Sequence, residues 1–122
     1  RAHIRSFCSS IACDIHPLNN LRVMNYIKTE FGADPTGDWY KHWIHEGFRS
    51  AEAFASHVPD SEFVYGNQPT LADAFLVPQM YNARRFDVPL DGFPNLVRIV
   101  DHCNEQQAFK DAAPESQADA TT

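Results

Sequence analysis

Cysteine, basic side chains and long apolar runs are all scarce in this sequence. The three cysteines form no CxxC pair and are odd in number, which argues against a disulfide framework and against a zinc knuckle. The 10 lysines and arginines are scattered among 16 acidic residues, so we expect no nucleic-acid partner. Apolar runs are too short to cross a bilayer and no secretory signal is recognisable, so we expect no membrane partner. Together these absences indicate a reducing, cytoplasmic location.

The apolar content is sufficient for one packed domain. With 122 residues, of which 43% are hydrophobic, the chain can bury about two-thirds of its unfolded surface. We therefore expect a single domain over residues 1–122. The sequence begins with an arginine and a helical period is already established there, so we also expect these residues to be a piece of a longer protein.

Apolar side chains recur every three or four positions through most of the chain, which is the period of an amphipathic helix. Turn-forming segments, including ADPTG at 33–37 and DVPLDGFP at 87–94, separate the helical stretches. We find no strand pair and no internal repeat, and the predicted fold class is an all-α bundle of about five or six helices. The helices are expected from the first residues to Ile15, from Leu18 to Gly32, from about Asp38 to Val58, after Thr70 and after Pro94.

The segment CDIHPLNNLRV, residues 13–23, interrupts this helical pattern. Pro17 lacks an N–H and disfavours helical conformation at the preceding residue, so the helix is predicted to break or kink there. Asn19 or Asn20 can cap the helix that restarts, and its free N–H groups favour an anion. Two interpretations stay open: a site that gathers His16 and the asparagines, or a break whose asparagines only satisfy backbone groups.

Thr70 and Asp73 have the spacing of a capping box at the start of the helix TLADAFLVPQM. The pair could also be drawn as a nucleophile and its orienting acid, but no histidine is near in sequence and capping accounts for both residues. We therefore predict a structural role for them. Pro78, inside the same helix, removes one backbone hydrogen bond and is expected to bend it.

No metal site is predicted. His42 and His45 could share a helix face with Asp38 and Glu46, yet the apolar stripe of that helix lies mostly elsewhere and leaves the four on a solvated face. A structural role is also predicted for the cysteines, which lack flanking bases and are expected to be small buried hydrophobes. These are Cys8, Cys13 and Cys103.

Arg84 and Arg85, in YNARRF, follow the helix that contains Pro78 and lie among aromatic residues. Adjacent helical side chains diverge by about 100°. Only one of the two can readily face a given cleft, and the other is free to be a surface charge. A guanidinium that faces a cleft can bind a carboxylate through two hydrogen bonds, but arginines are also common on surfaces.

Three segments closely resemble the C-terminal helical domain of zeta-class glutathione transferases, the maleylacetoacetate isomerases, with maleylpyruvate isomerases as near relatives. They are IACDIHPLNNLRV, PTLADAFLVPQMYNARRF and CNEQQAFKDAAPESQADA. The resemblance covers essentially the whole chain and implies a glutathione transferase C-terminal-like bundle in a homodimer. It also implies an N-terminal thioredoxin-like domain, outside this chain, that carries the motif activating the glutathione thiol. No catalytic residue is then expected in this fragment, which alone should be inactive.

The resemblance also implies a function. Such enzymes use glutathione to convert maleylacetoacetate into fumarylacetoacetate in phenylalanine and tyrosine catabolism. The thiolate adds to a cis double bond, rotation follows about the new single bond, and elimination leaves the trans isomer. Carried over position by position, the glutathione-binding residues are His16, Asn20, Leu21 and Arg22, and the residues that bind the small dicarboxylate substrate are Arg85 and Arg22.

One departure from the family pattern bears on the substrate. Some maleylpyruvate isomerases carry two successive arginines after the paired asparagines, whereas this sequence has Leu21 followed by Arg22. The single arginine favours maleylacetoacetate, although one substitution does not settle substrate identity. A maleylpyruvate isomerase or a general glutathione transferase is the alternative within the enzyme class. A non-catalytic, transferase-like interaction module is the alternative outside it.

Overall fold

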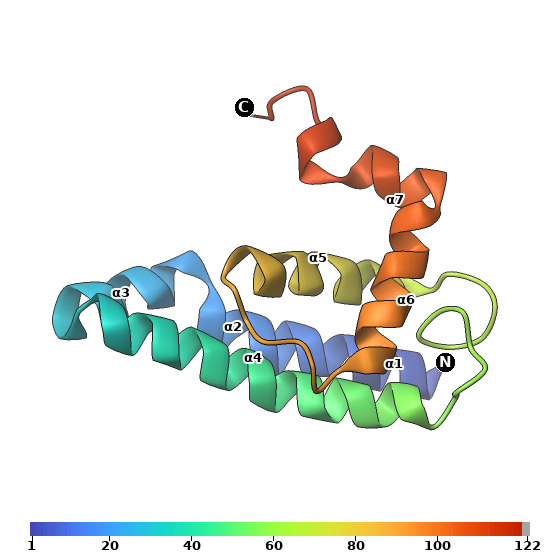
Figure 1. Ribbon diagram of the computed structural model, residues 1–122, viewed down its shortest axis with the longest axis horizontal. Helices are drawn as coiled ribbons and strands as arrows, with labels where there is room; N and C mark the ends of the chain where they lie inside the picture. Colours follow the sequence, from blue (N-terminus) through green and yellow to red (C-terminus); the bar gives the residue numbers. More distant parts are fainter. Residues whose placement is uncertain (121–122) are drawn as a thin grey trace.

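Helices account for most of residues 1–120, the part of the chain that the computed structural model describes (Figure 1). Five of the seven α-helical segments are eight residues or longer, and no strand occurs among the described residues. The predicted all-α fold is confirmed. The α-helices are α1 (Ala2–Ser9), α2 (His16–Asn19), α3 (Leu21–Phe31), α4 (Ala33–Ser56), α5 (Leu71–Arg85), α6 (Pro94–Glu105) and α7 (Gln107–Ala112). A π-helical segment (Ser10–Ile15) joins α1 to α2, and a 3-10 turn (Pro114–Ser116) follows α7.

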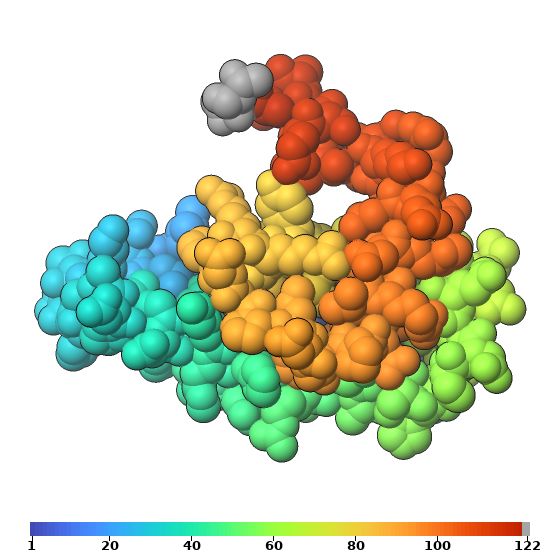
Figure 2. Space-filling view, in the orientation of Figure 1, coloured from blue at the N-terminus to red at the C-terminus, as the bar shows by residue number. Residues whose placement is uncertain are grey.

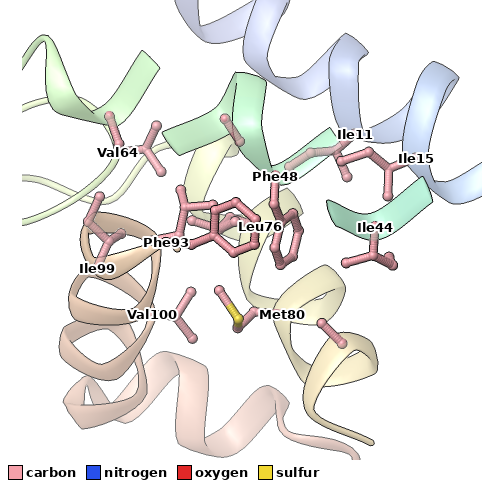
Figure 3. Close-up of a cluster of buried hydrophobic side chains, with 14 of the residues drawn as sticks. Ile11, Ile15, Ile44, Phe48, Val64, Leu76, Met80, Phe93, Ile99 and Val100 are labelled. Atoms are coloured by element: carbon pink, nitrogen blue, oxygen red, sulfur yellow. The ribbon is translucent and has the colours of Figure 1, made fainter. Parts of the chain in front are cut away.

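The long helix α4 forms the base of the bundle in Figure 1 and packs against α3, α2, the π-helical segment and α6. Helix α5 packs against α1, the π-helical segment and α6. The apolar stripe of α4 includes Ile44 and Phe48, both fully buried, as the helical period predicts. Phe48 meets Phe93 edge to face, with ring centroids 5.5 Å apart. Figure 3 shows side chains from α5 and α6 closing around this pair. One continuous core therefore holds α5, which carries most of the residues discussed below.

A close helix contact occurs at Gly47 of α4. A Cβ built at this position would overlap Cγ1 and Cδ1 of Ile15, and Ile15 is only 1% exposed. Glycine is required here because the π-helical segment lies directly against α4, leaving no room for a side chain. This contact sets how closely the segment before His16 lies to the base of the bundle.

The helical interruption lies at Asn20 rather than at Pro17. His16 has helical dihedrals of φ −59° and ψ −43°, so the prediction that Pro17 would push it out of the α region is wrong. The chain leaves the helix at Asn20, where φ is −69° and ψ is 157°. The reason is the wider π-helical turn before Pro17: the His16 N–H bonds to the Ile11 carbonyl. This widening separates the proline ring from the carbonyl it would otherwise meet.

The start of α4 also differs from the prediction. Residues 33–37 were expected to form a turn, yet the helix begins at Ala33. Pro35 is tolerated because it lies in the first helical turn, where backbone N–H groups have no partner within the helix. The preceding Gly32 has a φ of 97°, the positive value predicted for it at the end of α3.

The predicted capping box of α5 and the predicted proline at the start of α6 are both present. The Thr70 side chain accepts a hydrogen bond from the Ala72 N–H, and the Asp73 carboxylate accepts one of 2.7 Å from the Thr70 N–H. Pro94 is the first residue of α6. Glu52 of α4 also caps α6, because its carboxylate accepts hydrogen bonds from the Asn95 N–H and the Leu96 N–H, each 3.0 Å long.

A bilayer-spanning helix would need both length and a strongly apolar surface, and none of the helices described in residues 1–120 has this combination.

Candidate functional site

One face of α5 lines a cleft of about 510 Å³. The second half of α6, α7 and Pro114 form the opposite wall. We call α7 and the 3-10 turn that follows it the C-terminal segment, and Figure 2 shows the hollow between this segment and α5. Most of the lining is apolar, and the polar groups gather toward the C-terminal end of α5. The residues of α5 that line the cleft follow one helical stripe. They are Ala74, Val77, Pro78, Tyr81, Asn82, Arg84 and Arg85.

The two successive arginines have different surroundings. Arg84 Nη2 donates a hydrogen bond of 2.8 Å to Asp101 Oδ1 on α6, which neutralises its charge at the surface. The ion pairs among residues 1–120 are Arg84–Asp101 and Arg49–Glu46, so Arg85 has no carboxylate partner within the described chain. Both arginines line the cleft, so the prediction that only one of them would face it is wrong. The reason is that Arg84 lies three positions after Tyr81, on the same side of α5; the two arginines differ in their partners instead. Arg85 is the cation of the pair that is free to bind a ligand.

Aromatic rings support the end of α5 where Arg85 lies. The guanidinium carbon of Arg85 is 5.9 Å from the Phe86 ring centroid, within the range of a cation–π contact. Phe86 in turn packs against Tyr40 of α4, at a centroid distance of 4.4 Å. Burial raises the pKa of Tyr40 to about 12, and the charge of Arg85 opposes this increase. Tyr40 is therefore a neutral packing partner for the ring that Arg85 contacts.

His16 lines a separate groove of about 340 Å³ between the π-helical segment and α5. Three residues of α5 line both this groove and the cleft beside Arg85, namely Ala74, Pro78 and Asn82. The stripe on α5 therefore connects the two hollows. The structure places His16 and Arg85, which are far apart in the sequence, on adjoining parts of one surface.

Asn20 is the N-cap of α3. Its Oδ1 accepts a 3.1 Å hydrogen bond from the Val23 N–H, and its Nδ2 donates a 3.0 Å hydrogen bond to the Pro17 carbonyl. The predicted capping role is confirmed, and this side chain is already committed to the backbone. The next residues, Leu21 and Arg22, form the first turn of α3 and are exposed. A helix start of this kind presents backbone N–H groups that can receive an anion.

Sequence reasoning missed a contact between α5 and the C-terminal segment. The Tyr81 hydroxyl donates a 2.6 Å hydrogen bond to Glu115 Oε1, across 34 positions of the chain. This bond raises the pKa of Tyr81 and lowers that of Glu115. No periodicity or motif connects the two residues, because their proximity depends on the direction in which α7 leaves α6.

The other residues considered in the sequence analysis are structural or lie on the surface. Asp73 is fully buried and accepts a further 2.8 Å hydrogen bond from the Val64 N–H, as expected of a structural residue. His42 and His45 lie exposed on α4 as predicted. Among residues 1–120, no group of three or more histidine, cysteine or acidic side chains is arranged to hold a metal ion.

One of the cysteine predictions is wrong. Cys103 is buried and Cys8 is partly buried, but Cys13 is exposed. The reason is its place in the π-helical segment, where Ile11 and Ile15 occupy the inward face and Cys13 lies between them, turned outward.

This helical arrangement occurs in known proteins. Residues 44–107 match the family described as glutathione S-transferase, C-terminal domain. The chain belongs to the glutathione S-transferase C-terminal domain family. Curated relatives of this transferase domain include a probable maleylacetoacetate isomerase from Vibrio cholerae, 40% identical over 98% of this chain and 56% of the relative. Another is a maleylpyruvate isomerase from Ralstonia, 43% identical over 98% of this chain and 58% of the relative.

Solved structures extend the comparison. A holo structure of maleylpyruvate isomerase, a bacterial zeta-class glutathione S-transferase, superposes with a TM-score of 0.94 at 40% identity, over 99% of this chain and 58% of that one. A maleylacetoacetate isomerase from Anaeromyxobacter dehalogenans, with dicarboxyethyl glutathione and citrate in its active site, superposes with a TM-score of 0.95 at 31% identity, over 99% of this chain and 54% of that one.

The resemblance to the zeta-class transferase domain, predicted from three sequence segments, is therefore confirmed. The chain spans a little over half the length of the two curated relatives described, at 56% and 58%.

Proposed function

We propose that this transferase domain is the helical half of a glutathione-dependent cis–trans isomerase that converts maleylacetoacetate into fumarylacetoacetate. The observation that carries the proposal is Arg85, a cation with no carboxylate partner in the described chain, at the end of a largely apolar cleft. A conjugated diketo acid needs an apolar channel for its carbon chain and a fixed cation for its carboxylate. Relatives carrying the isomerase names, at 40% and 43% identity, support the same activity.

The residues around His16 are suited to glutathione, an anionic tripeptide. The groove beside α5 presents the His16 ring, and the nearby start of α3 presents backbone N–H groups and the Arg22 side chain. These are hydrogen-bond donors, which is the chemistry that peptide carboxylates require. Asn20 would contribute by fixing the start of α3, since its own amide is occupied. Glutathione, when bound, would supply the thiolate nucleophile of the reaction.

Other parts of the proposed enzyme lie outside this chain. We propose that a thioredoxin-like domain contributes most of the glutathione site and the group that activates the thiol, and that residues 1–122 form one helical domain with no catalytic residue of its own. The active protein would be a cytoplasmic homodimer. Sedimentation of the full-length protein would test the dimer, and a monomeric, fully active enzyme would rule it out.

In this proposal Arg85 orients the substrate through its carboxylate while the carbon chain lies along the α5 stripe. The guanidinium would hold the acid at one end, so that the double bond lies toward the groove of His16, where the thiol is expected. Orientation of this kind lowers the barrier by fixing the reacting atoms in advance. It requires no proton transfer from Arg85.

The test is Arg85→Ala in the full-length enzyme. We expect the KM for the diacid to rise more than that for glutathione, with a loss of about 1.5–3 kcal/mol in transition-state binding, as for a charged hydrogen bond. Arg84→Ala is the matched control, because Arg84 is adjacent but paired with Asp101. Equal effects of Arg85→Ala on both substrates, or equal effects of the two variants, would contradict the proposal.

The glutathione half is tested separately with His16→Ala. We expect weaker glutathione binding and little loss of stability, because His16 is exposed. A large fall in melting temperature with unchanged binding would instead assign His16 a structural role.

Maleylpyruvate is the second candidate substrate, since the relative from Ralstonia, at 43% identity, is named for it. Comparison of kcat/KM for the two cis acids would decide between them. The single arginine at the start of α3 favours maleylacetoacetate. If the enzyme isomerises neither acid, the proposed activity is wrong.

A further inference from the structure

The cleft beside Arg85 is divided from a second hollow by the C-terminal segment. This outer hollow, of about 530 Å³, is lined mainly by polar residues. Tyr81, Arg85 and Pro114 line both hollows, so they form the boundary between them. Figure 2 shows the C-terminal segment standing over α5 at this place.

The boundary is held by the hydrogen bond between Tyr81 and Glu115, which is 2.6 Å long and joins α5 to the 3-10 turn. The turn is itself attached to α7: Ser116 Oγ donates to the Lys110 carbonyl at 2.7 Å, and Gln117 Nε2 donates to the Asp111 carbonyl at 2.8 Å. The segment 114–117 is therefore an ordered extension of α7. Its one side-chain hydrogen bond to α5 within the described residues is the bond to Tyr81.

Both side chains of this hydrogen bond are exposed to solvent, so the bond is not one that mainly stabilises the fold. Tyr81 is 38% exposed and Glu115 is exposed, and polar contacts between exposed groups contribute little to folding. Tyr81 and Arg85 are one helical turn apart on the same face of α5. The bond therefore lies beside the guanidinium, at the end of the largely apolar cleft.

We propose that Tyr81 and Glu115 determine the length of substrate that the cleft accepts, by closing its end next to Arg85. Acids whose carboxylate reaches Arg85 fit within the closed cleft, and longer chains are excluded until the bond opens. This inference rests on the proposed function for the identity of the acid, but closure of the cleft can be tested without it.

The geometry sets the length at which selection should begin. Ala74 and Tyr81 lie seven positions apart on α5, which is about 10 Å at the rise of an α-helix. Substituents shorter than about 10 Å should remain inside the cleft, whereas longer ones should reach the bond between Tyr81 and Glu115. S-methyl glutathione and S-decyl glutathione are suitable probes on either side of this limit.

The experiment uses the full-length protein with Tyr81→Phe, Glu115→Ala and the double variant. Controls are Tyr65→Phe and Glu62→Ala, which change exposed residues of the loop before α5. One measurement is the rate of trypsin cleavage after the exposed Lys110, which reports attachment of the C-terminal segment. The other is calorimetric affinity for the two glutathione conjugates, expressed as the ratio of decyl to methyl.

We expect both single variants to speed cleavage after Lys110 and to raise the decyl-to-methyl affinity ratio by about three-fold or more, as for loss of one hydrogen bond. The double variant should have the same cleavage rate and the same affinity ratio as either single variant, because both substitutions break the same bond. Unchanged cleavage would show that the bond does not hold the segment. Faster cleavage with an unchanged affinity ratio would show that the segment does not select. Either result would overturn the proposal.

The two proposals can fail separately. If the wild-type enzyme isomerises no cis acid, the proposed reaction is wrong, while the affinity ratio still decides whether Tyr81 and Glu115 close the cleft. If isomerisation is observed and the ratio does not respond, the reaction stands and the closure is refuted.

Discussion

The contact between Gly47 and Ile15 permits a quantitative test of how closely the π-helical segment packs on α4. Adding a methyl group at Gly47 would overlap two atoms of Ile15. Ile15 is 1% exposed, so it cannot swing into solvent to make room. Gly37 lies in the same helix, and a Cβ added there would meet nothing within 4 Å. Gly37→Ala is therefore a matched control for Gly47→Ala.

The expected free energies follow from two terms. Replacing glycine by alanine inside a helix stabilises the folded state by about 0.5–1 kcal/mol. Gly37→Ala should show this gain alone. In Gly47→Ala the same gain is opposed by overpacking, which costs about 1–3 kcal/mol in a filled core. The backbone term cancels in the comparison, so the two variants should differ by about 1–3 kcal/mol in free energy of unfolding.

Urea unfolding is a suitable assay, because both tryptophans of the chain, Trp39 and Trp43, lie in α4. The midpoint should fall for Gly47→Ala and rise for Gly37→Ala at similar slope. Ile15→Ala alone should cost about 2–5 kcal/mol. Combined with Gly47→Ala it should cost less than the sum, because the new methyl group occupies part of the space released. Equal stability of the two glycine variants would refute the close packing described.

Three further predictions concern buried and exposed polar groups. Asp73→Ala should lower the free energy of unfolding by about 3 kcal/mol or more, measured by urea titration, since it leaves three donors at 2.7, 2.8 and 3.0 Å without their acceptor. The bond between Tyr81 and Glu115 should contribute fully between pH 4.5 and 10.0, the ordinary pKa values of these groups, because the folded pKa of Glu115 is lowered and that of Tyr81 is raised. Its contribution is lost as pH falls below 4.5 through the folded pKa of Glu115, or rises above 10.0 through that of Tyr81. Near-ultraviolet titration of the wild type and of Tyr81→Phe identifies the signal of Tyr81. That signal should ionise above pH 10.0, and a midpoint at or below pH 10.0 would contradict the prediction. Native protein should react at Cys13 with a thiol reagent, identified by mass spectrometry, while Cys103 stays unmodified, because burial raises the pKa of Cys103 to about 12.

Much of the fold was predictable because its signals are local. The stripe on α4, the capping box at Thr70 and Asp73, and the positive φ of Gly32 each depend on a few neighbouring residues. The break near Pro17 was placed wrongly for a related reason. A proline removes one N–H, but the π-helical turn before it depends on packing against α4, which the local sequence does not describe.

The candidate site was predictable in part. The rule that successive helical residues diverge predicted that only one of Arg84 and Arg85 would face the cleft, yet both line it. What distinguishes them is Asp101, which α6 brings to Arg84. The resemblance to a family had already favoured Arg85, and the geometry supplies a physical reason for the preference.

The sequence by itself determined the helices, their caps and the family to which the chain belongs, because these depend on periodicity and on short motifs. Tertiary structure alone decided that His16 and Arg85 lie on adjoining hollows and that Tyr81 meets Glu115 across 34 positions. Such contacts depend on the crossing of α5 and α6 and on the direction of α7. Those directions result from packing of the whole core, and no short segment specifies them.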